Sequence, residues 1–224
     1  MSEGVMAELP IVAALPELIS AMADFGAAVL VAPPGAGKTT VVPLALLDAG
    51  LAGDRRIALL QPRRVAARAT ARHMARLRGG RVGELVGYHV RFDRKIGADT
   101  RIEVLTEGLL TRRLQRDPFV ADLGLVILDE FHERSVDADL ALALLAEIRR
   151  EVRPDLRLLV MSATMDPGPV ADFLGGCPII EAAGRPYPVT IEHAPPPATA
   201  DPWRHCAGTV GEALRVDDGG HVLV

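Results

Sequence analysis

The stretch Ala32-Pro33-Pro34-Gly35-Ala36-Gly37-Lys38-Thr39-Thr40 lies between a short apolar run, 27–31, and a segment of helical character, 38–48. It matches the pattern GxxxxGKS/T except that Ala32 replaces the first glycine. Glycines let backbone N–H groups turn inward around phosphate oxygens, and a helix beginning near Lys38 points its positive end at them. The stretch therefore predicts a nucleotide-phosphate loop, with Lys38 reaching the β- and γ-phosphates and Thr39 binding Mg²⁺.

Apolar runs alternate with helical segments on both sides of this loop, which predicts an α/β fold. We expect a three-layer, mostly parallel sheet with helices on both faces, and chemistry at the carboxyl ends of its strands. The expected strands are 27–31, 56–60, 85–90, 102–105, 123–128, 156–161, 177–181 and 189–192. The expected helices are 10–24, 38–48, 63–78, 107–115, 136–150, 167–174 and 202–216.

The apolar run 123–128 ends in Asp129-Glu130-Phe131-His132. A carboxylate at a strand end beside a phosphate loop is placed to hold Mg²⁺, partly through water, and an adjacent glutamate can deprotonate an attacking water. Taken alone, the two acids could instead cap the following helix. Beside the phosphate loop we interpret Asp129, Glu130, Lys38 and His132 as catalytic. His132 either senses the γ-phosphate and links to the next motif, or is a packed core histidine.

The charge distribution points to a polyanionic partner. The net charge of the 224 residues is −4, yet 16 of the 25 basic residues lie between Arg55 and Arg116 with only five acidic residues. A basic block in an acidic chain predicts a polyanion-binding face, although solvated helix faces would give the same pattern.

The two cysteines, far apart, exclude a disulfide scaffold. With no secretory or membrane segment apparent, we expect a soluble, cytoplasmic protein.

Further motifs follow in a fixed order: Gln61-Pro62-Arg63-Arg64-Val65-Ala66-Ala67, Gly87-Tyr88-His89-Val90-Arg91-Phe92-Asp93, Thr106-Glu107-Gly108-Leu109-Leu110 and Ser162-Ala163-Thr164. Over residues 10–192 the chain resembles the DEAH/DExH-box ATP-dependent helicases of superfamily 2, and within them the bacterial HrpB-type branch. The resemblance implies the first RecA-like domain of a motor that couples Mg-ATP hydrolysis to movement on single-stranded RNA or DNA.

The same resemblance implies roles for individual residues. Phosphate binding would fall to Ala32, Pro33, Pro34, Gly35, Ala36, Gly37, Lys38, Thr39 and Thr40, and Mg²⁺ binding to Thr39, Asp129 and Glu130. Ser162, Ala163 and Thr164 would couple nucleotide state to strand movement. Arg63, Arg64, Thr106 and Gly108 would contact the nucleic acid. His73 or Arg72 would stack on the base, which predicts weak discrimination among nucleoside triphosphates.

The expected domain organisation is a helical extension, 1–25, a first RecA-like domain, 26–192, a Pro-rich linker and helix, 193–216, and the start of a second RecA-like domain, 217–224. The family's motifs IV to VI, with their arginine fingers, do not occur in the sequence. We therefore expect a partner domain in a longer chain, and residues 1–224 to be nearly inactive alone.

Two other functions remain open at this point. A self-contained P-loop phosphotransferase acting on a small molecule would use the same loop, but would not need the Gln61–Ala67 or Ser162–Thr164 segments. A non-catalytic nucleic-acid-binding module with a vestigial nucleotide site is disfavoured because Lys38, Thr39, Asp129 and Glu130 are all intact.

Overall fold

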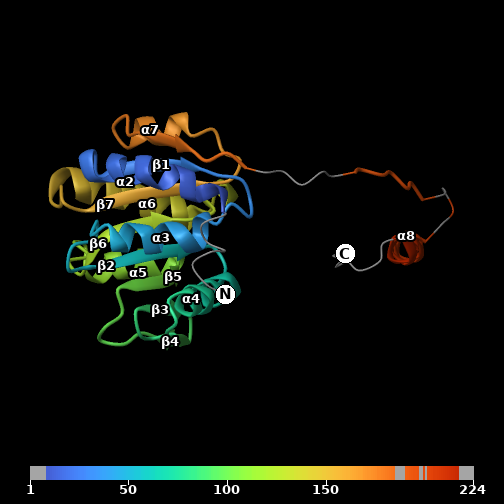
Figure 1. Ribbon diagram of the computed structural model, residues 1–224, viewed down its shortest axis with the longest axis horizontal. Coiled ribbons are helices and arrows are strands. Elements are labelled where there is room, and N and C mark those ends of the chain that lie inside the picture. The colour runs from blue at the N-terminus through green and yellow to red at the C-terminus, as the bar shows by residue number, and fades with distance from the viewer. Residues whose placement is uncertain (1–8, 185–189, 197–198, 200, 217–224) are drawn as a thin grey trace. The chain divides into compact units, whose positions relative to one another are not determined.

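The computed structural model describes residues 9–184, 190–196, 199 and 201–216. The chain divides into two compact units, Met1–Arg185 and Pro186–Val224. The first unit is a central sheet with helices on both faces (Figure 1). In the second unit the structure describes one helix, α8 (Pro202–Val216). No helix in the described parts of the chain is long and apolar enough to cross a membrane.

The sheet has eight strands in the order β4-β3-β5-β2-β6-β7-β1-β8. Neighbouring strands are parallel except for the antiparallel pair β3 and β4. The strands are β1 (Ala27–Val31), β2 (Arg56–Gln61), β3 (Val86–Val90), β4 (Asp93–Lys95), β5 (Ile102–Thr106), β6 (Leu123–Leu128), β7 (Arg157–Ser162) and β8 (Ile179–Glu181). This confirms the predicted mostly parallel sheet. Parallel neighbours require crossover connections, and the helices between the apolar runs supply them.

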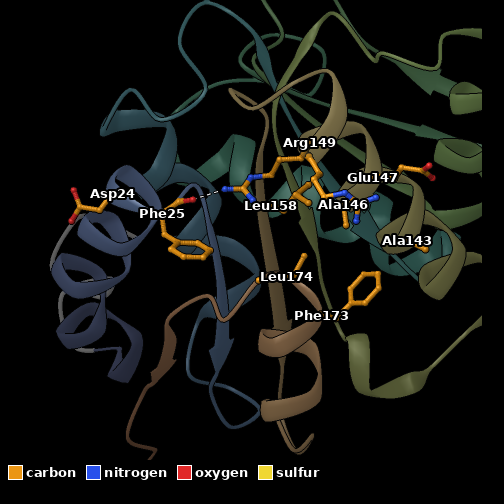
Figure 2. A pocket seen from close by; sticks show the side chains of 11 residues that line it. Asp24, Phe25, Ala143, Ala146, Glu147, Arg149, Leu158, Phe173 and Leu174 are labelled. Carbon is orange, nitrogen blue, oxygen red and sulfur yellow. Dashed lines mark hydrogen bonds between the residues drawn. The ribbon is translucent and has the colours of Figure 1, made fainter.

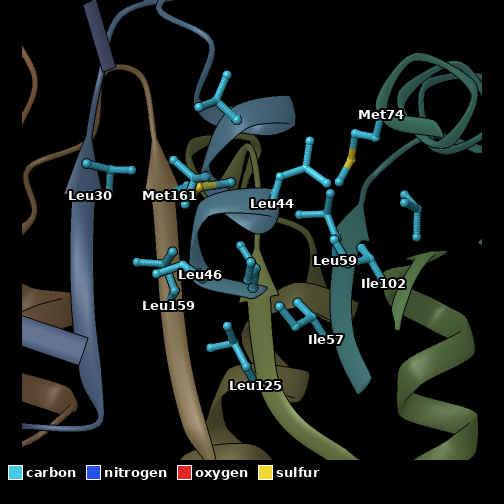
Figure 3. Close-up of a cluster of buried hydrophobic side chains, with 14 of the residues drawn as sticks. Leu30, Leu44, Leu46, Ile57, Leu59, Met74, Ile102, Leu125, Leu159 and Met161 are labelled. Atoms are coloured by element: carbon cyan, nitrogen blue, oxygen red, sulfur yellow. The ribbon is translucent and has the colours of Figure 1, made fainter. Parts of the chain in front are cut away.

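Alternate side chains of the buried strands enter two separate cores. One core packs the sheet against η1 (Pro10–Ala14), α2 (Leu15–Asp24), α3 (Lys38–Asp48) and α4 (Arg64–Leu77). Figure 3 shows part of it, where Leu30, Leu59 and Leu159 face Leu44, Leu46 and Met74. The other core packs the opposite face against α5 (Glu107–Arg116), α6 (Val136–Glu151) and α7 (Gly168–Phe173). The three-layer prediction is therefore correct.

A few elements differ from the sequence expectation. The expected helix 10–24 starts as the 3₁₀ turn η1, and the α-helix begins at Leu15 with Pro16 in its first turn, where a missing N–H costs nothing. Strand β4 and the 3₁₀ turn η2 (Phe131–Glu133) were not expected. Residues 190–192 of the expected strand 189–192 form no strand, while Val189 and the expected segment 217–224 lie outside the described residues.

Gly124 interrupts the register between β2 and β6. Arg56 pairs with Leu123 and Ile57 with Leu125, so Gly124 is an extra residue in a β-bulge. A Cβ at this position would overlap the carbonyl oxygen of Ala52 and lie 2.9 Å from its carbonyl carbon. The close approach of the two backbones therefore requires glycine here.

The two cysteines are predicted to differ sharply in reactivity. Burial raises the pKa of the Cys177 thiol to about 11, whereas Cys206 is exposed on α8. Because the thiolate is the reactive form, a maleimide at neutral pH is expected to label Cys206 alone in the native chain. Mass spectrometry of labelled peptides with and without denaturant checks this. Equal native labelling of both cysteines would contradict the buried position of Cys177.

Candidate nucleotide site

The phosphate loop leaves β1 and enters α3 through two glycines in the left-handed region. The φ angle of Gly35 is +79°, and that of Gly37, the residue before α3, is +93°. Both angles lie in a region that glycine occupies without strain. The loop conformation is thus set by these two positions.

The backbone donors of this loop can be accounted for individually. The N–H groups of Ala32, Ala36 and Thr40 donate to carbonyls of Ser162, Pro33 and Gly37, and the two prolines have no N–H. Within the described residues, no acceptor binds the N–H groups of Gly35, Gly37, Lys38 and Thr39. Four free donors at one helix N-terminus form a cradle for an anion. Of the residues predicted to bind phosphate, these four have a backbone donor available.

Asp129 lies at the end of β6 and is 1% exposed. Its Oδ2 accepts hydrogen bonds from the Thr39 hydroxyl at 2.7 Å and from the Gln61 side-chain amide at 2.6 Å. Its Oδ1 accepts from the backbone N–H of Glu130 at 2.9 Å. Burial raises the pKa of this carboxyl, and the hydrogen bond from Thr39 opposes the rise. The structure thus brings together two of the three residues predicted to bind Mg²⁺, Thr39 and Asp129.

Glu130 connects the lysine of the loop to His132. Lys38 is 4% exposed, and its Nζ lies 3.2 Å from Oε1 of Glu130. The other carboxylate oxygen, Oε2, lies 3.5 Å from Nδ1 of His132. The backbone N–H of Ala163 points at that same nitrogen, with 3.4 Å between the two nitrogen atoms. A chain of contacts therefore runs from Lys38 to the predicted coupling segment.

The backbone at Glu130 is strained. Its φ is +51° and its ψ is +36°, the left-handed region, which costs a non-glycine residue on the order of 1 to 3 kcal/mol. Such strain persists where the surrounding structure fixes it, and it is concentrated at functional sites. The turn aims the Glu130 carboxylate at the loop, as its contact with Lys38 shows.

The predicted coupling segment begins beside the loop. Ser162 ends β7 and pairs in register with Val31, the last residue of β1. Its carbonyl accepts the N–H of Ala32 at 3.0 Å, and its buried hydroxyl accepts the N–H of Met165 at 3.2 Å. Thr164 is exposed. The segment is thus bonded directly to the first residue of the phosphate loop.

The predicted nucleic-acid residues are partly gathered in one place. Arg64, Thr106 and Gly108 line a cavity of about 510 Å³. Arg63 does not line it, and its guanidinium pairs with Glu133 at 3.2 Å. The predicted base contacts, Arg72 and His73, lie on α4. Within the described residues, no hydrogen bond or ion pair joins either of them to the phosphate loop.

Gln61 had no role of its own in the sequence expectation, although it stands in the motif-like segment that includes Arg63. Its side chain is 3% exposed and binds Asp129, 68 positions further along the chain. The available signal was a polar residue at the end of an apolar strand. Strands β2 and β6 are neighbours, so their carboxyl ends lie side by side and bring this residue next to the acidic end of β6.

A cavity of about 710 Å³ lies away from this site (Figure 2). It is bordered by Leu158 near the start of β7 and by the carboxyl-terminal ends of α2, α6 and α7, including Phe25, Arg149 and Phe173. Parallel strands begin at one end of the sheet and finish at the other, so this cavity lies at the end opposite the phosphate loop. No residue of the phosphate loop borders this cavity.

The parallel sheet, the glycine loop at the start of α3 and the acidic end of β6 define a RecA-like P-loop nucleotide-binding domain. A family model described as "DEAD/DEAH box helicase" matches residues 13–173. The chain belongs to the DEAD/DEAH box helicase family.

Individual relatives agree with this assignment. The chain is 46% identical over 219 residues to the ATP-dependent RNA helicase HrpB of Escherichia coli (strain K12), an alignment that covers 97% of this chain and 27% of the relative. It is 34% identical over 189 residues to the ATP-dependent RNA helicase HrpA of Borreliella burgdorferi, covering 84% and 23%. The crystal structure of E. coli DEAH/RHA helicase HrpB superposes with a TM-score of 0.88, covering 95% of this chain and 27% of that one. The chain thus spans about a quarter of the length of these relatives.

Proposed function

We propose that this chain is the first RecA-like domain of an ATP-driven RNA helicase motor. The observation that carries the proposal is the buried Asp129, which accepts hydrogen bonds from Thr39 of the phosphate loop and from Gln61. Gln61 begins the segment that includes Arg63 and Arg64, the predicted nucleic-acid contacts. One carboxylate therefore connects the nucleotide site to the nucleic-acid side of the domain. The relatives described as ATP-dependent RNA helicases favour RNA over DNA.

The residues present fit Mg²⁺ bound together with a nucleotide. No cluster of three or more acidic, histidine or cysteine side chains in the described residues could hold a metal ion without other ligands. Mg²⁺ in nucleotide sites is commonly held by one or two protein groups, with substrate phosphates and water completing the shell. Thr39 and Asp129 would supply the protein groups. The ion would neutralise charge that develops on the phosphate oxygens.

The contacts of Glu130 suggest how nucleotide binding activates it. In the structure its carboxylate is paired with Lys38 at 3.2 Å. A γ-phosphate bound in the cradle would compete for the lysine, because a phosphate carries more negative charge than a carboxylate. The released carboxylate would then orient an attacking water and accept its proton. His132 and Ala163 would transmit the change to the Ser162–Thr164 segment.

A second RecA-like domain is part of the proposal, because the chain spans only 27% of E. coli HrpB. Arginine fingers raise kcat by about 10³ to 10⁵ in other nucleotidases, so the domain alone should hydrolyse ATP poorly. We place this domain at 26–192, preceded by an extension, 1–25, and followed by a linker and helix, 193–216. Two free cysteines suit the reducing cytoplasm, where we place the protein.

The test is phosphate release from Mg-ATP by this chain and by a chimera in which it replaces the matching part of E. coli HrpB. Single-stranded RNA is expected to stimulate the chimera only. Glu130→Gln should abolish that stimulation, whereas Glu147→Gln, on an exposed position of α6, should leave it unchanged. Equal activity of chain and chimera, indifferent to RNA, would instead indicate a self-contained phosphotransferase.

The site is predicted to bind ATP and GTP with nearly equal affinity. Its free backbone donors and Lys38 address the phosphates, which the two nucleotides share. Stacking on His73 or Arg72 would not separate adenine from guanine, since both bases present similar π-faces. Competition between the two nucleotides for a fluorescent analogue measures this. A tenfold or larger preference for ATP would mean that a base-reading contact exists.

A further inference from the structure

A second basic cavity adjoins the one that holds Arg64, Thr106 and Gly108. It measures about 430 Å³ and is bordered by α5 and by strands β3, β4 and β5. The two cavities share two lining residues, Leu109 and Arg112, both on α5. The two cavities therefore lie next to each other along this helix.

The strands place their contribution on the α5 side of the sheet. His89 of β3 pairs with Arg94 of β4 and with Leu105 of β5. Paired residues on neighbouring strands point to the same face of a sheet, and Leu105 packs into the core beneath α5 and α6. Arg94 thus extends from the outermost strand toward the same cavity as Arg112 and Arg116 of α5.

The carboxylates of this second cavity are already engaged. Arg113 binds Glu103 at 3.1 Å and also pairs with Asp122. Asp117 accepts backbone N–H groups of Phe119 and Ala121, both at 3.2 Å. These acids are therefore neutralised or bonded within the fold, and they do not compete for the remaining arginines.

Three arginines of the cavity have no such partner. Arg94, Arg112 and Arg116 are exposed, and none forms an ion pair within the described part of the chain. Guanidinium groups in a shared cavity repel one another and attract an anion that bridges them. A ligand with regularly repeated phosphates satisfies this better than a single carboxylate, because the arginines are spread along α5 and β4.

We propose that this cavity extends the nucleic-acid path: the strand that passes Arg64, Thr106 and Gly108 continues along α5, and its phosphates bind Arg112, Arg116 and Arg94. The inference rests on the proposed RNA-binding function and adds a second contact region to it. Arginine contacts to phosphate are independent of base sequence, so the extension raises affinity and the reach of the domain without selecting a sequence.

The test measures binding of fluorescent oligouridines of about 5 and about 12 nucleotides, lengths within the usual single-strand site sizes. The double variant Arg94→Gln/Arg116→Gln leaves the shared Arg112 intact. The matched control, Arg76→Gln/Arg81→Gln, removes the same charge from exposed arginines of a separate cavity beside α4. Fluorescence anisotropy over a series of salt concentrations gives both the affinity and its salt dependence.

The long oligonucleotide should bind the Arg94/Arg116 variant on the order of tenfold more weakly than it binds the wild type. The slope of log K against log salt should fall by about 1.4, the contribution of two phosphate contacts on a single strand. The short oligonucleotide and the control variant should show no comparable loss. Crosslinking of thiouridine in the long oligonucleotide to residues 109–116 of the wild-type chain gives an independent reading that requires no variant.

Two outcomes would overturn this inference while leaving the proposed function intact. The first is equal affinity of the wild type and the Arg94/Arg116 variant for the long oligonucleotide, together with no crosslinks to α5. The second is an equal loss of affinity in the control variant, which would show that only the net charge matters. The first would leave an acidic protein segment as the better occupant. Failure of the wild-type chain to bind the short oligonucleotide even at low salt would overturn the proposed RNA-binding function itself.

Discussion

Replacing Lys38 with alanine is expected to weaken Mg-ATP binding by about a hundredfold. Lys38 is the lysine of the phosphate loop, and it is buried beside the free N–H groups of the cradle. A hydrogen bond to a charged group contributes about 1.5–3 kcal/mol, and each 1.4 kcal/mol is a factor of ten in affinity. The variant would also leave the Glu130 carboxylate without its partner, close to the phosphates. Titration calorimetry with Mg-ATP measures the loss.

The chain contains its own control for this experiment. Lys95, the only other lysine in the sequence, is exposed on β4 at the edge of the sheet. Lys95→Ala makes the same chemical change and the same change in net charge, and it should leave Mg-ATP binding unchanged. Unaltered affinity in Lys38→Ala, or an equal loss in Lys95→Ala, would show that the loop does not bind the phosphates.

The second large effect concerns stability. Gly124→Ala is expected to lower the free energy of unfolding by about 3 kcal/mol, because the new methyl group overlaps the carbonyl oxygen of Ala52. The obstacle is backbone, so relief requires the turn before β2 to move away from β6. For a chain of this size the loss corresponds to a melting temperature roughly 6–12 °C lower. Thermal unfolding followed by circular dichroism measures it.

Gly80→Ala is the matched control. A Cβ at Gly80 would meet the carboxylate of Glu84, the end of a flexible side chain, at 2.9 Å. That carboxylate accepts a hydrogen bond from the backbone N–H of Arg81 at 2.8 Å, but the bond is exposed to water, which can replace it. That group can move aside, so a melting temperature close to that of the wild type is expected. Similar melting temperatures for Gly124→Ala and the wild type would show that the bulge adapts to a side chain.

The sequence was sufficient for those parts of the site that depend on neighbouring residues. The phosphate loop and the acidic end of β6 are local patterns, and the sheet order brings them together. The hydrogen bond between Gln61 and Asp129 joins positions 68 apart, so recognising it requires the order of the strands in the sheet as well as the polar residue at the end of each strand. The left-handed backbone of Glu130 is also invisible in the sequence, because it is imposed by the tertiary structure against the residue's own preference.

The fold was predictable where apolar periodicity is strong. The central strands β1, β2, β6 and β7 carry continuous apolar runs, since both of their faces are buried. Strand β4 consists of Asp93, Arg94 and Lys95, and it exists only because β3 offers it a hydrogen-bonding partner. The error at residues 190–192 is the opposite one: the sequence pattern predicted a strand there, and the structure has none.

The two outer strands of the sheet restrict how this domain can associate with other chains. Both β4 and β8 are only three residues long, and β4 is wholly charged. Short and charged outer strands discourage a strand of another chain from pairing with the sheet. Such pairing is how edge strands with unpaired backbone groups lead to aggregation. Contact with further domains must therefore use strand ends and helix surfaces, which leaves the nucleotide loop at an end of the sheet open to a facing domain.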